Sequence, residues 1–171
     1  GKSALLANWK LRHERQGHRA RVGAHDKFVF WHAVGCSRPS MQVSAMLRRL
    51  MTELAEHFEL ARPVPKDDDR LSWDFPRFLE LAAKKGHVIL LLDGMQNLVS
   101  GNAESGFKWL PLSLPPNVRV VLSATTNEQL PTRHPDDHSL RKQPRVLLEL
   151  ERRKWDRITL SPLPREMSAA I

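Results

Sequence analysis

The feature that most constrains the fold is an apolar run at residues 88–92, VILLL, which ends in Asp93. A strand without a polar position must be covered on both faces, as the central strands of parallel sheets are. Residues 118–122 repeat the type, and residues 27–34 carry the β-branched and aromatic side chains of a buried strand. The sequence therefore predicts one sheet that contains these three strands.

Helical patterns separate the first two of these strands. Between residues 43 and 58, apolar side chains recur at spacings of three and four, and Ser40 stands where a helix N-cap is expected. Residues 62–70, with two prolines and three consecutive aspartates, indicate an exposed loop. Strands joined through helices imply right-handed crossovers and a three-layer α/β sheet. In such sheets, ligands bind beyond the carboxyl ends of the strands.

A second helix is expected directly before the central strand. Asp74 is its expected cap, and Pro76 lies in its expected first turn, where proline is tolerated. Gly86 is its expected stop. This helix would lead straight into the apolar strand.

The remaining segments carry weaker patterns. Residues 101–117 are expected to connect two strands outside the core, with a short helix near residues 107–110. Residues 127–144 are polar and rich in histidine and proline, which indicates another segment outside the core. Residues 146–150 and 158–160 are candidates for further strands.

The chain opens with Gly1, Lys2 and Ser3, followed by a helical pattern. This is the form of the end of a phosphate-binding loop, G-x-x-x-x-G-K-[ST], running into its helix. Glycine lets the backbone approach phosphate, lysine places a positive charge on the β- and γ-phosphates, and the serine hydroxyl can ligate magnesium. A chance tripeptide is the alternative, so a second element has to decide.

Asp93 is that second element. A carboxylate at the carboxyl end of an apolar strand lies where a magnesium-bound nucleotide would lie. The alternative is a buried strand that ends at a turn-forming Asp93-Gly94 pair. The order of the two elements is that of P-loop ATPases with an inserted strand, which favours a nucleotide site. The expected fold is α/β, a three-layer and mostly parallel P-loop NTPase sheet that lacks its N-terminal strand and most of its phosphate-binding loop.

The run LLLDGMQNL, residues 90–98, resembles the Walker B segment of NACHT-type ATPases of the STAND class. Further segments resemble the nephrocystin-type branch of that family, in which NACHT domains join tetratricopeptide repeats. They are residues 32–36, the WLP block at 109–111 with 114–115, residues 118–123 and residues 160–163. The resemblance covers residues 1–163, and residues 164–171 would begin a following linker or helical segment.

The resemblance implies ATP or ADP with Mg²⁺ as ligands. It assigns Lys2 and Ser3 as phosphate and magnesium contacts beside Gly1, and Asp93 as the magnesium carboxylate. Protein partners would bind through flanking repeats of a larger protein, and self-association stays open. A cytoplasmic location is expected, and an association with cilia is implied by the family alone.

Two departures from the family bear on hydrolysis. Where the family has acidic residues after the magnesium aspartate, this chain has Gln96 and Asn97, and neither amide can act as a general base. Where many relatives carry an arginine after the next strand, it has Ser123 and Thr125, which could at most hydrogen-bond a γ-phosphate or its attacking water. Gln96 could still orient a water, so slow turnover stays open.

Composition bounds the partners. Lys and Arg outnumber Asp and Glu by 27 to 19, but the basic residues lie in short groups without interleaved aromatic residues, so exposed faces are preferred over a nucleic-acid site.

No apolar stretch reaches the roughly 18 residues of a membrane span, which predicts a soluble protein. The single cysteine, Cys36, cannot form an internal disulfide and fits a reducing, intracellular compartment as a packed thiol. His134 and His138 are read as part of an exposed loop, because Pro135 breaks the helix that a metal pair would need.

The favoured hypothesis is an ATP-binding, NACHT-like switch in a larger protein, with weak or absent hydrolysis. The first alternative is a degenerate nucleotide-binding fold that acts as a scaffold for protein contacts. The second is a basic nucleic-acid-binding module, prompted by the net charge of +8.

Overall fold

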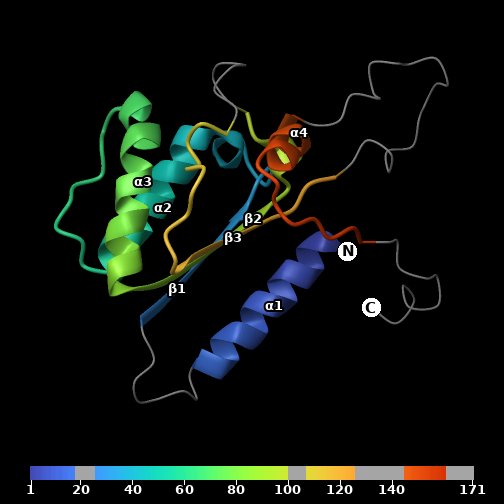
Figure 1. Cartoon of the computed structure of the whole chain (residues 1–171), viewed down its shortest axis with the longest axis horizontal. Coiled ribbons are helices and arrows are strands. Elements are labelled where there is room, and N and C mark those ends of the chain that lie inside the picture. The colour runs from blue at the N-terminus through green and yellow to red at the C-terminus, as the bar shows by residue number, and fades with distance from the viewer. Residues whose placement is uncertain (18–25, 100–106, 126–144, 161–171) are drawn as a thin grey trace.

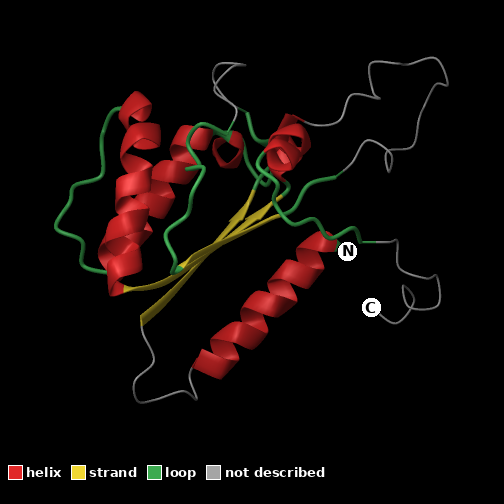
Figure 2. Cartoon of the chain, viewed as in Figure 1, coloured by secondary structure: helices red, strands yellow, loops and turns green. Residues whose placement is uncertain are grey.

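The computed structural model describes residues 1–17, 26–99, 107–125 and 145–160. These residues form α-helices, parallel strands and two short 3-10 helices, η1 and η2 (Figures 1 and 2). In chain order they are α1 (Lys2–Gly17), β1 (Asp26–Ala33), η1 (Pro39–Met41), α2 (Val43–His57), α3 (Asp68–Lys85), β2 (Gly86–Asp93), η2 (Met95–Asn97), β3 (Val118–Leu122) and α4 (Arg145–Arg152). No helix in the described ranges is long and apolar enough to cross a membrane.

The three strands form a parallel sheet in the order β1-β2-β3. Ala33 pairs with Asp93 at the ends of β1 and β2, and Leu92 pairs with Leu122 at the end of β3. All three strands therefore end at the same edge of the sheet, called the carboxyl edge below. The α/β class is confirmed, and the predicted strand bounds hold to within two residues.

One face of the sheet is covered by α2 and α3 (Figure 2). Every second strand residue points to this face, and seven of these side chains are buried: Phe28, Phe30, His32, Val88, Leu90, Leu92 and Val118. The facing stripe of α2 is also buried: Met46, Leu47, Leu50, Met51 and Leu54. Each apolar side chain of this size contributes roughly 1.5–3 kcal/mol when fully buried. The core therefore lies between the sheet and these two helices.

The other face of the sheet is covered by α1, which lies opposite α2 and α3 (Figure 1). Leu91 of β2 points to this face and is 1% exposed. The cover is partial, because Leu5 and Trp9 on α1 and Val121 on β3 are 55%, 40% and 43% exposed. Helix α1 runs against the strands and begins at the carboxyl edge (Figure 1).

The predicted cap of the long helix is wrong. Ser40 lies in η1, and α2 begins after it at Val43, with Gln42 as the N-cap. The Ser40 hydroxyl oxygen instead accepts the backbone N–H groups of Gly35 and Ser37, at 3.1 and 3.0 Å. Serine favours a turn as strongly as a helix start, because its hydroxyl satisfies nearby backbone groups in both.

The second helix begins earlier than predicted. Asp67 caps α3, and its side chain accepts the N–H of Asp69 at 3.0 Å. The consecutive aspartates therefore start a helix, where they also complement the helix dipole, and do not belong to a loop. Asp74 and Pro76 both lie inside α3, whereas Gly86 follows its last residue as predicted.

Three later predictions are wrong. Residues 107–110 form a turn and not a helix, and three of their side chains are buried in the core: Phe107, Trp109 and Leu110. Residues 146–150 lie within α4, because a five-residue apolar run does not distinguish a strand from a helix by its period. Residues 158–160 form no strand.

Two further expectations concern Cys36 and the segment 127–144. Cys36 is exposed in the turn after β1, so the expectation of a packed thiol is wrong. The segment 127–144, with His134 and His138, lies outside the described residues.

Candidate functional site

Strand β2 delivers Asp93 to the carboxyl edge, and the chain then turns sharply. Gly94 has a φ of 74°, which glycine adopts without strain. A Cβ atom at this position would lie 2.9 Å from the carbonyl oxygen of Val34, so the turn has no room for a side chain. The side chain of Asp93 is buried at 7% exposure, and its backbone carbonyl accepts the N–H of Val34 at 2.8 Å.

Ser123, the first residue after β3, contacts the Asp93 carboxylate. Its backbone N–H donates to the carbonyl of Leu92 at 2.9 Å, which places it directly beside Asp93. The Ser123 hydroxyl donates to Oδ1 of Asp93 and accepts the N–H of Gly94 at 3.0 Å. Within the described ranges, this hydroxyl is the one hydrogen-bond donor to the Asp93 side chain. The structure thus brings two predicted site residues together.

A second hydrogen bond across the carboxyl edge joins Gln96 and Thr125. The side-chain oxygen of Gln96 accepts the backbone N–H of Thr125 at 3.1 Å. A backbone N–H can only donate, so this contact fixes which end of the amide is oxygen. The oxygen of Gln96 therefore has one of its two acceptor sites engaged, and its NH₂ group is the end that can donate to a ligand. Gln96 itself is exposed in η2.

Gly1, Lys2 and Ser3 begin α1 at the same edge of the sheet (Figure 1). The first helical hydrogen bond runs from the N–H of Leu5 to the carbonyl of Gly1 at 3.0 Å, so the N–H groups of the first turn have no partner within the helix. The side chain of Asp93 points to the face of the sheet that α1 covers, because its neighbours in the β2 alternation, Val88, Leu90 and Leu92, fill the opposite face. The start of α1 and Asp93 therefore lie at the same edge of the sheet and on the same face, a region called the corner below.

This corner fits a phosphate with a magnesium ion. A helix N-terminus with a lysine favours anions, and carboxylate and hydroxyl oxygens are the ligands that Mg²⁺ prefers. Lys2 is half-buried and Ser3 is exposed. In the part of the chain that the structure describes, no three His, Cys, Asp or Glu residues gather as a metal cluster. The donor set thus suits a metal that is held mainly by phosphates and water, with one or two protein ligands.

His32, close to this edge on β1, is a buried polar residue that the sequence did not single out as functional. Its Nε2 lies 2.9 Å from the carbonyl oxygen of Ser40, and its Nδ1 lies 3.2 Å from a guanidinium nitrogen of Arg49. A carbonyl only accepts and a guanidinium only donates, so the ring is neutral with its proton on Nε2. Burial lowers the pKa of His32, and the charge of Arg49 lowers it further. A single histidine inside a strand gives no sequence signal for this arrangement.

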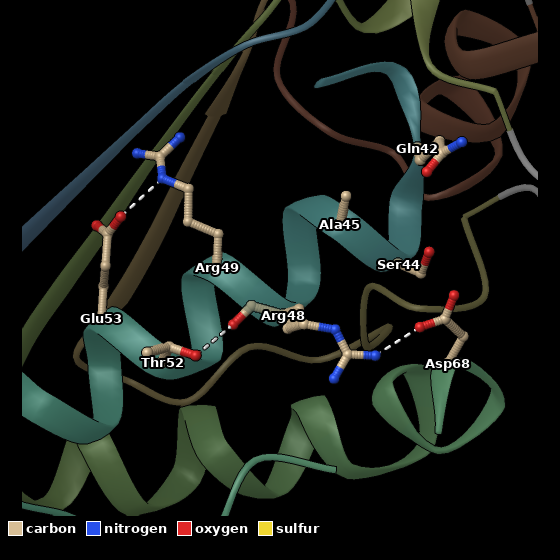
Figure 3. Close-up of a pocket in the computed structure, with 8 residues that line it drawn as sticks. All are labelled: Gln42, Ser44, Ala45, Arg48, Arg49, Thr52, Glu53 and Asp68. Atoms are coloured by element: carbon tan, nitrogen blue, oxygen red, sulfur yellow. Dashed lines mark hydrogen bonds and ion pairs between the residues drawn. The ribbon is translucent and has the colours of Figure 1, made fainter. Parts of the chain in front are cut away.

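An open groove of about 610 Å³ lies over α2 and the start of α3 (Figure 3). None of the predicted site residues lines this groove. The lining residues are Gln42, Ser44, Ala45, Arg48, Arg49, Thr52, Glu53 and Asp68. Arg48 donates to the carbonyls of Pro65 and Lys66 and pairs with Asp68, so its charge fixes the loop before α3. Arg49 pairs with Glu53. Both cations are thus engaged by the protein itself, and the groove offers no free charge to a ligand.

A parallel sheet with flanking helices, and a central apolar strand that ends in a carboxylate, define an α/β protein consistent with a P-loop-like domain. The sequence is 31% identical to mouse nephrocystin-3 over 137 residues, which cover 77% of this chain and 9% of that protein. It is 22% identical to a TPR repeat-containing protein of Dictyostelium discoideum, over 72% of this chain and 9% of that protein. It is also 27% identical to the mouse NACHT domain- and WD repeat-containing protein 1, over 62% of this chain and 7% of that protein.

These similarities indicate a NACHT-like or TPR-type relationship. The chain spans less than a tenth of the length of the curated relatives it matches, 9% for nephrocystin-3. No protein-family model matches the sequence. No solved structure matches it either.

Proposed function

We propose that the chain is a NACHT-like, ATP-binding module that acts as a switch within a larger protein. The observation that carries this proposal is the corner of the fold shared by Asp93 and the start of α1. Lys2, Ser3 and the carboxylate come from sequence positions far apart and lie at the edge where α/β proteins bind ligands. The similarity to the mouse NACHT domain- and WD repeat-containing protein 1 supports the same assignment.

In this proposal each residue has a distinct role. The N–H groups of the first turn of α1 and the Lys2 ammonium bind the β- and γ-phosphates, and Gly1 lets the backbone come close to them. Ser3 and Asp93 contribute oxygen ligands to Mg²⁺, which supplies charge stabilisation to the phosphates when it is bound. Burial of Asp93 at 7% exposure limits competition from water for its carboxylate.

The arrangement of the sheet adds an argument about topology. The connection from β1 through α2 and α3 to β2 passes over one face and moves from β1 toward β3. Helix α1 lies on the opposite face, so a right-handed connection from a preceding strand through α1 into β1 must move the other way. Such a strand would lie beyond β3, and the loop between it and Gly1 would pass close to Asp93 and Ser123. This is the place where a phosphate-binding loop needs to be.

We expect binding to be stronger than hydrolysis. Gln96 and Asn97 supply no carboxylate that could accept a proton from water. The oxygen of Gln96 accepts the N–H of Thr125, which leaves it one further acceptor site beside the two donors of the NH₂ group. These groups suit a phosphate oxygen or the positioning of a water, but neither takes a proton from the water. Nucleotide state would then control the parent protein through different affinities for its open and closed arrangements.

The test is binding of a fluorescent ATP analogue with Mg²⁺, in the longest natural form of the protein and in the present chain. Lys2→Ala should weaken binding at least tenfold, because a charge-assisted hydrogen bond to phosphate contributes roughly 1.5–3 kcal/mol. Lys84→Ala is the matched control, since Lys84 is exposed in the last turn of α3, near the opposite edge of the sheet. Unchanged binding in Lys2→Ala would refute the proposal.

A scaffold without nucleotide binding is the second candidate, and the neutral Gln96 and Asn97 favour it. A magnesium-dependent ATPase activity that Asp93→Asn abolishes would count decisively against the scaffold. Nucleic-acid binding gains no support, because the arginines that form ion pairs include Arg48, Arg49, Arg62, Arg77, Arg152, Arg153 and Arg157. Binding of nucleic-acid probes that weakens with salt would revive it.

A further inference from the structure

Ser123 is a polar residue that is buried at the carboxyl edge, at 8% exposure, as are Asp93 and His32 nearby. Its position follows from the register of the sheet. Leu122 pairs with Leu92, so the next residue on each strand, Ser123 and Asp93, point to the same face side by side. Within β3 itself the polar residue is Arg119, which lies near the opposite end of the strand.

The hydrogen bonds of Ser123 decide what its hydroxyl can do. A serine hydroxyl has one proton, and Ser123 donates it to Oδ1 of Asp93. The same oxygen accepts the N–H of Gly94 at 3.0 Å. A hydroxyl in this state has no proton left for a phosphate oxygen. Ser123 therefore acts on Asp93, and direct contact with the nucleotide would require the bond to Asp93 to break.

We propose that Ser123 is a positioning residue that fixes the Asp93 carboxylate for magnesium. The hydroxyl occupies Oδ1 and holds the carboxylate in one orientation, which directs the remaining oxygen, Oδ2, to the metal of a bound nucleotide. This inference rests on the proposed function, since it takes Asp93 as a magnesium ligand. It assigns to Ser123 a role through the metal, in place of a contact with the γ-phosphate.

The proposed role of Ser123 predicts different effects on magnesium affinity and on nucleotide affinity. Loss of a residue that orients a metal ligand weakens metal affinity, in known cases by roughly 10- to 100-fold. Loss of a direct phosphate contact would instead weaken nucleotide binding with or without metal. The two roles are therefore distinguished by the magnesium dependence of binding and not by its strength alone.

The experiment titrates Mg²⁺ against a fixed concentration of fluorescent ATP analogue, in the longest natural form of the protein. Ser123→Ala should raise the half-saturating Mg²⁺ concentration by roughly tenfold or more, and it should change metal-free nucleotide affinity less than twofold. Ser123→Thr keeps the hydroxyl and should restore the wild-type magnesium dependence. Ser113→Ala, at an exposed serine before β3, is the matched control and should have no effect.

A double variant makes the test sharper. In an Asp93→Ala background, Ser123→Ala should add no further change in magnesium dependence, because Ser123 acts only through Asp93. The inference is overturned if Ser123→Ala leaves the magnesium titration unchanged, or weakens metal-free and metal-bound nucleotide by the same factor. If the wild-type protein binds no nucleotide at all, the proposed function fails and the inference falls with it, which is a different result from either of these.

Discussion

Arg153 offers the most quantitative test of how the fold is held together at the carboxyl edge. It follows α4, and its side chain is only 5% exposed. The guanidinium donates to the carbonyls of Leu110 at 2.8 Å, Phe107 at 2.9 Å and Pro111 at 3.2 Å, and it pairs with Glu149 at 2.7 Å. One buried cation thus joins α4 to the segment 107–111, which lies in the core.

Arg153→Ala should strongly destabilise the protein. The substitution leaves two well-formed carbonyl acceptors, those of Leu110 and Phe107, without their donor. Glu149 keeps its second partner, Arg152, and the longer contact to Pro111 adds little. A hydrogen bond to a charged group contributes roughly 1.5–3 kcal/mol, and two of them are lost. We expect the free energy of unfolding to fall by about 3–5 kcal/mol in urea denaturation, since the contacts belong to one unit and do not add fully. Arg153→Lys keeps the charge but not the fork of donors, and should give an intermediate loss.

The chain provides its own control. Arg152 pairs with the same carboxylate, Glu149, at 2.7 Å, but its side chain is 63% exposed. Arg152→Ala should therefore cost much less stability than Arg153→Ala, because an exposed ion pair contributes little. An Arg153→Ala variant that is no less stable than Arg152→Ala would refute the account of Arg153 as a buried link.

Three further predictions concern single groups. Burial lowers the pKa of His32, so as the pH falls the unfolded chain binds this proton at a higher pH than the folded chain does. The free energy of unfolding should therefore fall as the pH drops through 6.5, and His32→Gln should reduce that fall in urea titrations. Arg152 and Arg153 lower the pKa of Glu149 from 4.5 to about 2, so its contribution to stability is complete above 4.5 and lost as pH falls toward 2. Glu149→Gln should remove this part of the acid transition, and identical acid-unfolding curves would contradict the assignment. Gln96→Glu should raise magnesium-dependent release of phosphate from ATP, and unchanged turnover would show that a missing base is not what limits hydrolysis.

The sheet could be predicted from sequence because burial on both faces leaves an unmistakable pattern. Residues 88–92 are apolar enough to require a central position, residues 118–122 are mostly apolar, and the helix at 43–58 has one clear apolar stripe. Helix starts were predicted poorly, because serine and aspartate satisfy turns and helix caps with the same hydrogen bonds. The sequence therefore predicts caps at Ser40 and Asp74, whereas the structure has them at Gln42 and Asp67.

Long-range contacts account for the rest. The segment 107–110 has no periodicity, and its burial depends on α4 and Arg153, far along the chain. Asp93 could be picked out from the strand that precedes it. The bond from Ser123 to Asp93 could not, because it depends on the register of β2 with β3. The neutral state of His32 likewise needs two partners from other elements, Ser40 and Arg49.

The most direct test of the central claim locates the metal of a bound nucleotide. Mn²⁺ replaces Mg²⁺ in complexes with ATP and broadens the NMR signals of nearby amides. The account predicts broadening of the amides of Ser3, Gly94 and Ser123 at the carboxyl edge, with Gly86 at the opposite end of β2 unaffected, and loss of the effect in Asp93→Asn. Broadening centred on the groove at Arg48 and Asp68, or equal broadening in Asp93→Asn, would contradict a nucleotide site at this corner of the fold.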